Sequence, residues 1–141
     1  MKLGGASFEL LFHALVGQLE VGRSAVVETA FIPEYHNARF RSLRDRYPFT
    51  AVQVYCTAEA EVLFERFIGR AASGERHPGH VDQQSMSRER FLEMLEARRY
   101  GKLETGDRSS GDLYLEIDTT DVATVDVDAL IATIRDHVDQ P

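Results

Sequence analysis

Apolar residues recur every three to four positions in five stretches of the chain, and polar or breaker residues separate these stretches. This period is typical of a helix that buries one face. Serine or threonine at a helix start and glycine after a helix end mark the usual boundaries. The pattern predicts helices from Ser7 to Gly22, from Pro33, from Thr57 to Gly74, from Ser85 or Ser87, and over the stretch that carries Val127, Leu130, Ile131 and Ile134.

Three shorter runs have the composition of β-strands. Residues 24–31 (SAVVETAF) and 50–56 (TAVQVYC) are nearly continuous apolar runs, as in strands covered on both faces, whereas residues 113–118 (LYLEID) alternate, as at a sheet edge. Strands that alternate with helices predict an α/β fold, a three-layer parallel sheet with helices on both faces. Three strands make a short sheet, since the mean is about five to six.

Bulk composition narrows the function. The 141 residues, 43% of them hydrophobic, predict a single domain over residues 1–141. A formal charge of −7 argues against a nucleic-acid partner. Cys56 is the only cysteine, which excludes an internal disulfide and indicates a cytoplasmic protein, and we expect it to be buried rather than nucleophilic. The first residues resemble neither a secretory segment nor a membrane span, and no membrane partner is expected.

Three segments lie at the carboxyl ends of the predicted strands, where open parallel sheets bind ligands. These segments are residues 28–31, 56–59 and 118–121. Glu28 ends an apolar strand, which makes it a candidate for work on substrate or on a magnesium-bound water; the alternative is an ion pair with an arginine of the next helix. The arginines of that helix spread around its axis and are predicted to be mainly solvated: Arg39, Arg41, Arg44 and Arg46.

The most charged feature is the arginine-rich stretch 66–82, which includes SGERHPGHVD. Arg66 and Arg70 lie four residues apart and so on one helical face, and Arg76 follows. Guanidinium groups suit the oxygens of a transferring phosphoryl group. The alternative is a solvated helix face on which Arg66 and Arg70 pair with neighbouring glutamates such as Glu59.

A divalent metal is a third interpretation of this stretch, since His77, His80 and Asp82 carry suitable ligand atoms. Pro78 and Gly79 favour a turn between the two histidines, and no fourth ligand is evident. We therefore assign no metal-ligating residues.

Taken together, GRSAVVETAFIPEYH, VQVYCTAEAEVLFERFIGRAASGERHPGHVD and LEIDTTD resemble the small P-loop kinases of the AAA-type ATP-binding group, near the zeta-toxin and chloramphenicol-phosphotransferase-like proteins. The resemblance runs from about Leu3 to Ile134, and the arginine-rich stretch is its most specific part. It implies a P-loop NTPase kinase-like fold, with transfer of a phosphoryl group from ATP, with Mg²⁺, to a small-molecule hydroxyl.

The resemblance also implies residue roles. Residues 66–82 look like the lid over the phosphates, with Arg70 and Arg76 as catalytic arginines. The expected nucleotide-binding residues are Arg66, Asp118, Thr119 and Thr120. Glu28 and Phe31 lie where such kinases bind the acceptor substrate.

One part of the family pattern is missing. P-loop kinases need G-x-x-x-x-G-K-[ST], whose backbone N–H groups and lysine hold the phosphates. Lys2 and Lys102 are the only lysines, and neither lies in such a string. The first, central strand of the family sheet comes before the phosphate loop, so we expect this chain to lack both and to be an incomplete kinase, inactive on its own.

Two alternatives remain open. The chain could be a non-catalytic nucleotide- or phosphate-binding module derived from a kinase. It could also be an interaction module in which a second copy or a partner fills the vacant sheet position by strand addition, which makes a homo-oligomer an expected partner.

Overall fold

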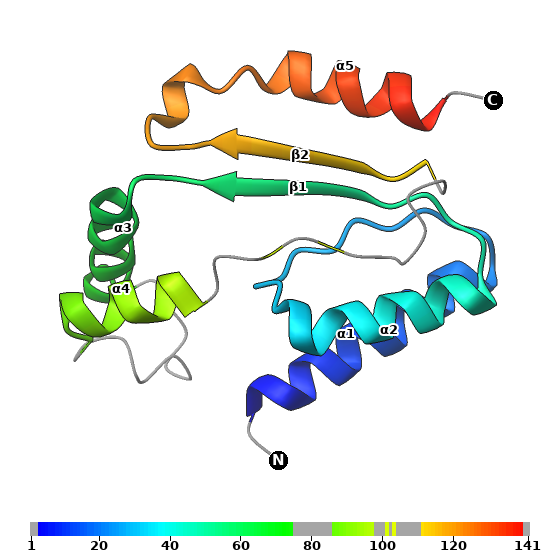
Figure 1. The fold of residues 1–141 in the computed structure, drawn as a ribbon, viewed down its shortest axis with the longest axis horizontal. Helices are drawn as coiled ribbons and strands as arrows, with labels where there is room; N and C mark the ends of the chain where they lie inside the picture. Colours follow the sequence, from blue (N-terminus) through cyan, green and yellow to red (C-terminus); the bar gives the residue numbers. More distant parts are fainter. Residues whose placement is uncertain (1–2, 75–85, 98–100, 102, 104–110, 140–141) are drawn as a thin grey trace. The chain divides into compact units, whose positions relative to one another are not determined.

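The computed structural model describes residues 3–74, 86–97, 101, 103 and 111–139. The chain divides into two compact units: of the described residues, 3–49 and 103 belong to the first unit, and 50–74, 86–97, 101 and 111–139 belong to the second. The first unit contains α1 and α2, and the second contains β1, α3, α4, β2, a short 3₁₀-helix and α5 (Figure 1). The predicted single domain of 141 residues stays a prediction, since two compact units can belong to one domain.

The first unit is a pair of helices, α1 (Leu3–Glu20) and α2 (Pro33–Arg46), which lie side by side in Figure 1. Aromatic rings join them, as where the ring of Phe12 on α1 meets that of Phe40 on α2 at 5.2 Å between centroids. The start of α2 at Pro33 confirms the sequence prediction. The predicted start of α1 at Ser7 is wrong: the helix begins at Leu3 and includes Gly4 and Gly5 in spite of their low helix propensity.

Residues 24–31, predicted as a buried strand, form neither helix nor strand. Val26 in the middle of this run is fully exposed, at 103%. A strand is stable only beside another strand, because its N–H and C=O groups need partners in a ladder. No described residue supplies that ladder, so the run does not form a strand in spite of its β-rich composition.

The second unit is built on a parallel pair of strands, β1 (Val52–Thr57) and β2 (Leu113–Asp118). They pair in register from Val52 opposite Leu113 to Thr57 opposite Asp118. The described part of the chain is therefore an α/β fold with a two-stranded parallel sheet and five α-helices. The remaining predicted strand, residues 24–31, does not form there.

Helices connect and flank this pair. α3 (Ala60–Ala72) leaves the carboxyl end of β1, and α4 (Arg88–Ala97) packs on α3 through Phe91, which is buried at 7% exposure. After β2 come the 3₁₀-helix Val122–Thr124 and α5 (Val127–Val138), which runs back along β2 (Figure 1). The His137 ring near the end of α5 bonds the Gly111 carbonyl just before β2.

Two predicted helix starts have different outcomes. Ser87 begins α4 as predicted, since its Oγ accepts the Arg90 N–H at 3.2 Å. Thr57 does not begin α3: it is the last residue of β1, and Glu59 precedes the helix without a side-chain cap. Among the described helices, none combines the length and the apolar character that crossing a bilayer requires.

Candidate functional site

The carboxyl ends of β1 and β2 are joined by a compact set of hydrogen bonds, which we call the strand-end cluster: Thr57, Glu59, Arg66, Thr119 and Thr120. The Thr57 carbonyl accepts both the N–H and the Oγ1 hydroxyl of Thr119, each at 2.7 Å. The Oγ1 of Thr120 accepts the Glu59 N–H at 2.9 Å. The loop after β2 thus supplies a polar partner at the entry of α3, where Glu59 has no side-chain cap of its own.

Arg66 extends the cluster from α3. One of its terminal nitrogens donates to the carbonyl oxygens of Thr119 at 2.8 Å and Thr120 at 3.0 Å. These contacts join residues 53 and 54 positions apart in the sequence and are partly buried. A charged donor makes stronger hydrogen bonds than a neutral one, so Arg66 holds the loop after β2 against α3.

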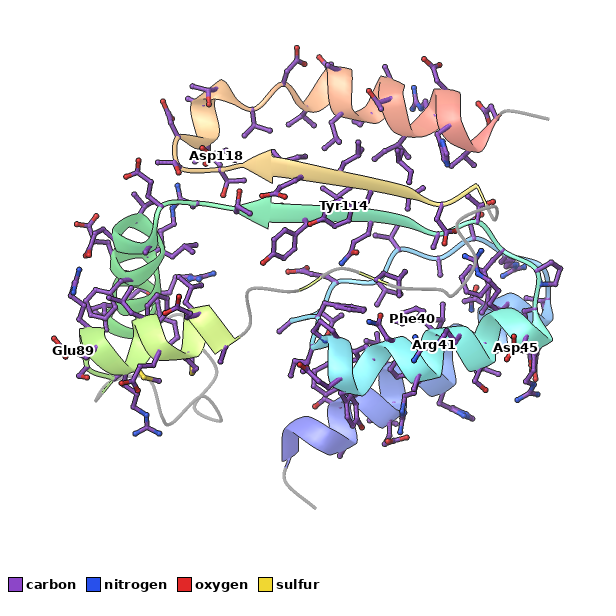
Figure 2. The ribbon with its side chains drawn as sticks, in the orientation of Figure 1. Phe40, Arg41, Asp45, Glu89, Tyr114 and Asp118 are labelled. Atoms are coloured by element: carbon purple, nitrogen blue, oxygen red, sulfur yellow. The ribbon has the colours of Figure 1, made fainter. Side chains whose placement is uncertain are left out.

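Asp118 lies at the arrowhead end of β2 (Figure 2). Its Oδ1 accepts the Thr120 N–H at 2.8 Å, a local bond that closes the turn after the strand. Hydrogen bonds from the Thr120 side chain and backbone hold the pKa of the Asp118 carboxyl below its usual range. Asp118 therefore adds a stable negative charge to the rim of the strand-end cluster.

Arg70 is exposed one helical turn after Arg66, and its Nε donates to the Arg66 carbonyl at 3.3 Å. Neither arginine forms an ion pair within the part of the chain that the structure describes, so the predicted alternative of pairing with neighbouring glutamates such as Glu59 does not hold there. Arg66 is engaged by backbone oxygens instead, and Arg70 extends from the same helix.

The other predicted site residues are not members of the strand-end cluster, and some of them lie outside the described residues. Glu28 is exposed and Phe31 half-buried, both in the first unit. Arg76 and the SGERHPGHVD turn with His77, His80 and Asp82 lie outside the described residues. Cys56, predicted to be buried, is exposed because its face of β1 is incompletely covered. The described residues hold no group of three or more metal-ligating side chains.

A second set of contacts on the sheet had no sequence prediction. Gln53 donates its side-chain N–H to the Gly101 carbonyl, and the rings of Tyr55 and Tyr114 stack at 6.3 Å. A Cβ atom on Gly101 would lie 2.7 Å from Cε2 of Tyr55, so this close approach requires glycine. Burial, followed by the nearby Glu116 charge, raises the Tyr114 pKa. In the sequence, only Gly101 in YGKLE could have indicated this close approach, since glycine is favoured where a backbone packs tightly against another group.

The arginines of α2 were predicted to be mainly solvated. For Arg39 this prediction is wrong, because its side chain contacts residues of α1. It donates to both carboxylate oxygens of Glu9 on α1, at 3.0 Å for the longer bond, and its guanidinium lies 5.0 Å above the Phe12 ring. The Arg39 contact joins the two helices. Arg44 and Arg46 also lie over rings, those of Phe49 and Tyr47, whereas Arg41 is exposed.

No family model matches the chain, and no curated protein does. Among solved structures it is similar to "a putative kinase from Chloroflexus aurantiacus", with a TM-score of 0.79 and 32% sequence identity. The match covers 96% of this chain and 70% of the other. The chain therefore belongs to the same family as this kinase and has a kinase-like fold.

Proposed function

We propose that this chain carries the lid and nucleotide side of an ATP-dependent phosphotransferase that acts on a small-molecule hydroxyl. The proposed architecture is a P-loop NTPase of the AAA-type group, near the zeta-toxin and chloramphenicol-phosphotransferase-like kinases, with a three-layer sheet. The observation that supports it most is the contact of Arg66 with Thr119 and Thr120. The family resemblance had implied one nucleotide site for these residues, which are distant in the sequence.

The proposed roles follow from phosphoryl-transfer chemistry, in which positioning and charge stabilisation do most of the work. Arg66 holds the loop of Thr119 and Thr120, and this loop with Asp118 faces the nucleotide. Arg70 is a catalytic arginine, and its exposed guanidinium is suited to the negative charge of the transferring group.

Three further residues complete the proposed roles. Arg76 is proposed as the second catalytic arginine, and Glu28 and Phe31 as the acceptor side. The acceptor must expose a hydroxyl, since the reaction forms its oxygen–phosphorus bond while the bond to the ADP leaving group breaks.

We propose that magnesium is bound as part of the Mg²⁺–ATP substrate and not by residues of this chain. The sequence has no G-x-x-x-x-G-K-[ST] string, and the described residues do not form a set of metal ligands. They therefore do not fit a magnesium site, and we derive no step through the ion. The same missing string supports the proposal that these 141 residues do not turn over ATP alone.

The edge of β1 that faces away from β2 is open to pairing with a further strand. The carbonyls of Ala51 and Thr57 accept from Leu113 and Thr119, so by alternation the backbone groups of Val52, Val54 and Cys56 face away from β2. No described residue pairs with that edge. An added parallel strand there would complete a central position in the sheet and bring a phosphate-binding loop to the carboxyl ends of the strands.

A chimera tests the proposal. The part of the Chloroflexus protein that this chain does not cover is joined to this chain, and ATP binding is measured by calorimetry with ATP and Mg²⁺. We expect binding by the chimera and none by the 141 residues. Arg66→Ala in the chimera should weaken binding at least tenfold, whereas Arg41→Ala, an exposed arginine on α2, should leave it unchanged. A folded chimera that binds no ATP would contradict the proposal.

The open edge of β1 also favours a second candidate, an interaction module that pairs with another copy of the chain. Val54 on this strand is 37% exposed, which leaves apolar surface beside the open edge. Sedimentation of the chain over a range of concentrations separates the candidates. A dimer that dissociates when Val54 is replaced by Lys favours the module, and a monomer at all concentrations excludes it.

A further inference from the structure

His36 on α2 has no exposed surface and lies inside a set of aromatic rings. The ring of Phe8 from α1 meets it edge-on at 4.7 Å between centroids. Phe31 lies at 5.1 Å, Tyr35 at 5.2 Å and Phe12 at 6.0 Å. An imidazole in such surroundings is desolvated, which disfavours its charged form.

One nitrogen of this imidazole has a defined task. The Ile32 N–H donates to His36 Nδ1 at 2.8 Å. Ile32 occupies the position before α2, where its apolar side chain cannot cap the helix, and Pro33 follows. His36 therefore reaches back to the backbone at the helix entry, as the glutamate of a capping box does.

This hydrogen bond requires a neutral imidazole. Because Nδ1 accepts, the proton of the neutral ring is on Nε2, and Nε2 has no hydrogen-bond partner among the described residues. A second proton would convert Nδ1 into a donor facing the Ile32 N–H. Protonation therefore both breaks this bond and places a charge among the rings.

The charge near the ring also disfavours protonation of His36. Burial lowers the pKa of His36 most, and the nearby Arg39 charge lowers it further. From α1, Glu9 is engaged by Arg39 and by the Tyr35 hydroxyl, and among the described residues no charged side chain other than Arg39 acts on the ring. The described surroundings therefore offer the imidazolium no counter-charge of its own.

We propose that His36 is a proton-sensitive latch that holds Phe31 and Ile32 against the α1–α2 pair and releases them when its imidazole becomes charged. Glu28 and Phe31 belong to the same segment, so release changes the presentation of the residues proposed for the acceptor side. The latch itself does not depend on phosphoryl transfer, and its test uses the 141-residue chain without nucleotide.

The sign of the pH effect follows from the lowered pKa of His36. The unfolded chain takes up the proton near pH 6.5, whereas the folded chain resists it. The contribution of His36 to stability is therefore complete above about pH 6.5 and is lost as the pH falls toward the pKa of the folded state. Over that window the unfolding equilibrium constant rises up to about tenfold per pH unit.

The first test needs no substitution. The ring protons of His36 are titrated by NMR between pH 7.5 and pH 4.5, and exchange of the Ile32 amide is followed over the same range. We expect His36 to titrate below its ordinary value and Ile32 to lose protection as it does. A His36 that titrates at or above about pH 6.5, or an Ile32 amide that stays protected in the imidazolium form, would overturn the proposal.

Two substitutions at position 36 distinguish the effect of the hydrogen-bond acceptor Nδ1 from the effect of the packed ring. Asn at position 36 keeps an acceptor near the place of Nδ1 but cannot be charged, so His36→Asn should protect Ile32 at every pH and remove the pH dependence. His36→Phe keeps a ring and should leave Ile32 unprotected at every pH. His13→Asn, at an exposed histidine of α1, is the matched control and should retain the wild-type pH dependence. Wild-type pH dependence in His36→Asn would contradict the latch.

Discussion

Residues 24–31 and β1 are two apolar, β-rich runs of similar length that differ in what they become. β1 pairs with β2 along its whole length, while residues 24–31 pair with nothing in the described chain and expose Val26 fully. Composition does not explain the difference, since both runs contain small and β-branched residues. The comparison shows that β-propensity is expressed only where a neighbouring strand supplies a ladder.

The two edges of β1 also differ in the contacts that matter for the proposed function. On the paired side of β1, the strand end is tied to the loop after β2 by Thr119, Thr120 and Arg66. On its other side the backbone groups of Val52, Val54 and Cys56 have no described partner. In this kinase-like fold one edge of β1 is therefore paired and tied to the loop after β2, and the other edge is where we propose that a further strand is added.

The largest expected effect concerns Arg76 in the ATP-binding chimera described above. Arg76→Ala should lower the rate of phosphoryl transfer by about 10³-fold, because the arginine would stabilise charge on the transferring group. The rate is measured as ADP formation at saturating ATP. Arg41→Ala is the control, and an unchanged rate in Arg76→Ala would remove this arginine from the site.

A smaller effect is expected from the core of the second unit, which sharpens the contrast between paired and unpaired regions. Phe91 is 7% exposed and packs on Phe67 at 5.1 Å between ring centroids. Phe91→Ala should lower the free energy of unfolding by about 3 kcal/mol, measured by urea titration. Val122→Ala, at a side chain 65% exposed, is the control. Equal losses in the two variants would mean that α3 and α4 do not form a core.

The pH dependence of Asp118 gives a smaller effect still. Its pKa is lowered, so its charged form adds stability above about pH 4, and this contribution is lost as the pH falls through the pKa of the folded state. Asp118→Asn should therefore be less stable than the wild type at pH 7 and approach it in acid. Asp128→Asn on α5 is the control. A stability difference that does not change with pH would show that the Asp118 charge is not the cause.

The smallest effect is expected in the unpaired run. Val26→Ser should change the free energy of unfolding by less than about 0.5 kcal/mol, because the Val26 side chain is already in solvent. Urea titration beside the Phe91→Ala variant measures both on one scale. A loss above about 1 kcal/mol would show that residues 24–31 are packed in solution and would break the comparison.

Much of the fold was predictable from local signals. The start of α2 at Pro33, the strand of residues 113–118 and the capping of α4 by Ser87 follow from proline geometry, alternation and a serine hydroxyl. The strand predicted for residues 24–31 failed because pairing is not a local property. The exposure of Cys56 was missed for the same reason, since burial on a sheet depends on what covers the face.

The candidate site was predictable in part. The sequence resemblance assigned Arg66 and the Asp118–Thr120 turn to one site, and Arg66 contacts Thr119 and Thr120. The role of His36 was missed, because a lone histidine on a helix carries no signal of its partner four residues earlier. The contact between Arg39 and Glu9 was missed because it joins residues 30 positions apart.

Hydrogen exchange of the backbone amides in the chimera tests the central claim most directly. If the chain belongs to a kinase sheet that lacks one strand, the added segment should protect the amides of Val52, Val54 and Cys56 and also those of residues 24–31. Both runs should then exchange as slowly as β2, whereas in the 141 residues alone they exchange fast. A folded chimera in which these amides still exchange as fast as in the chain alone would contradict the account.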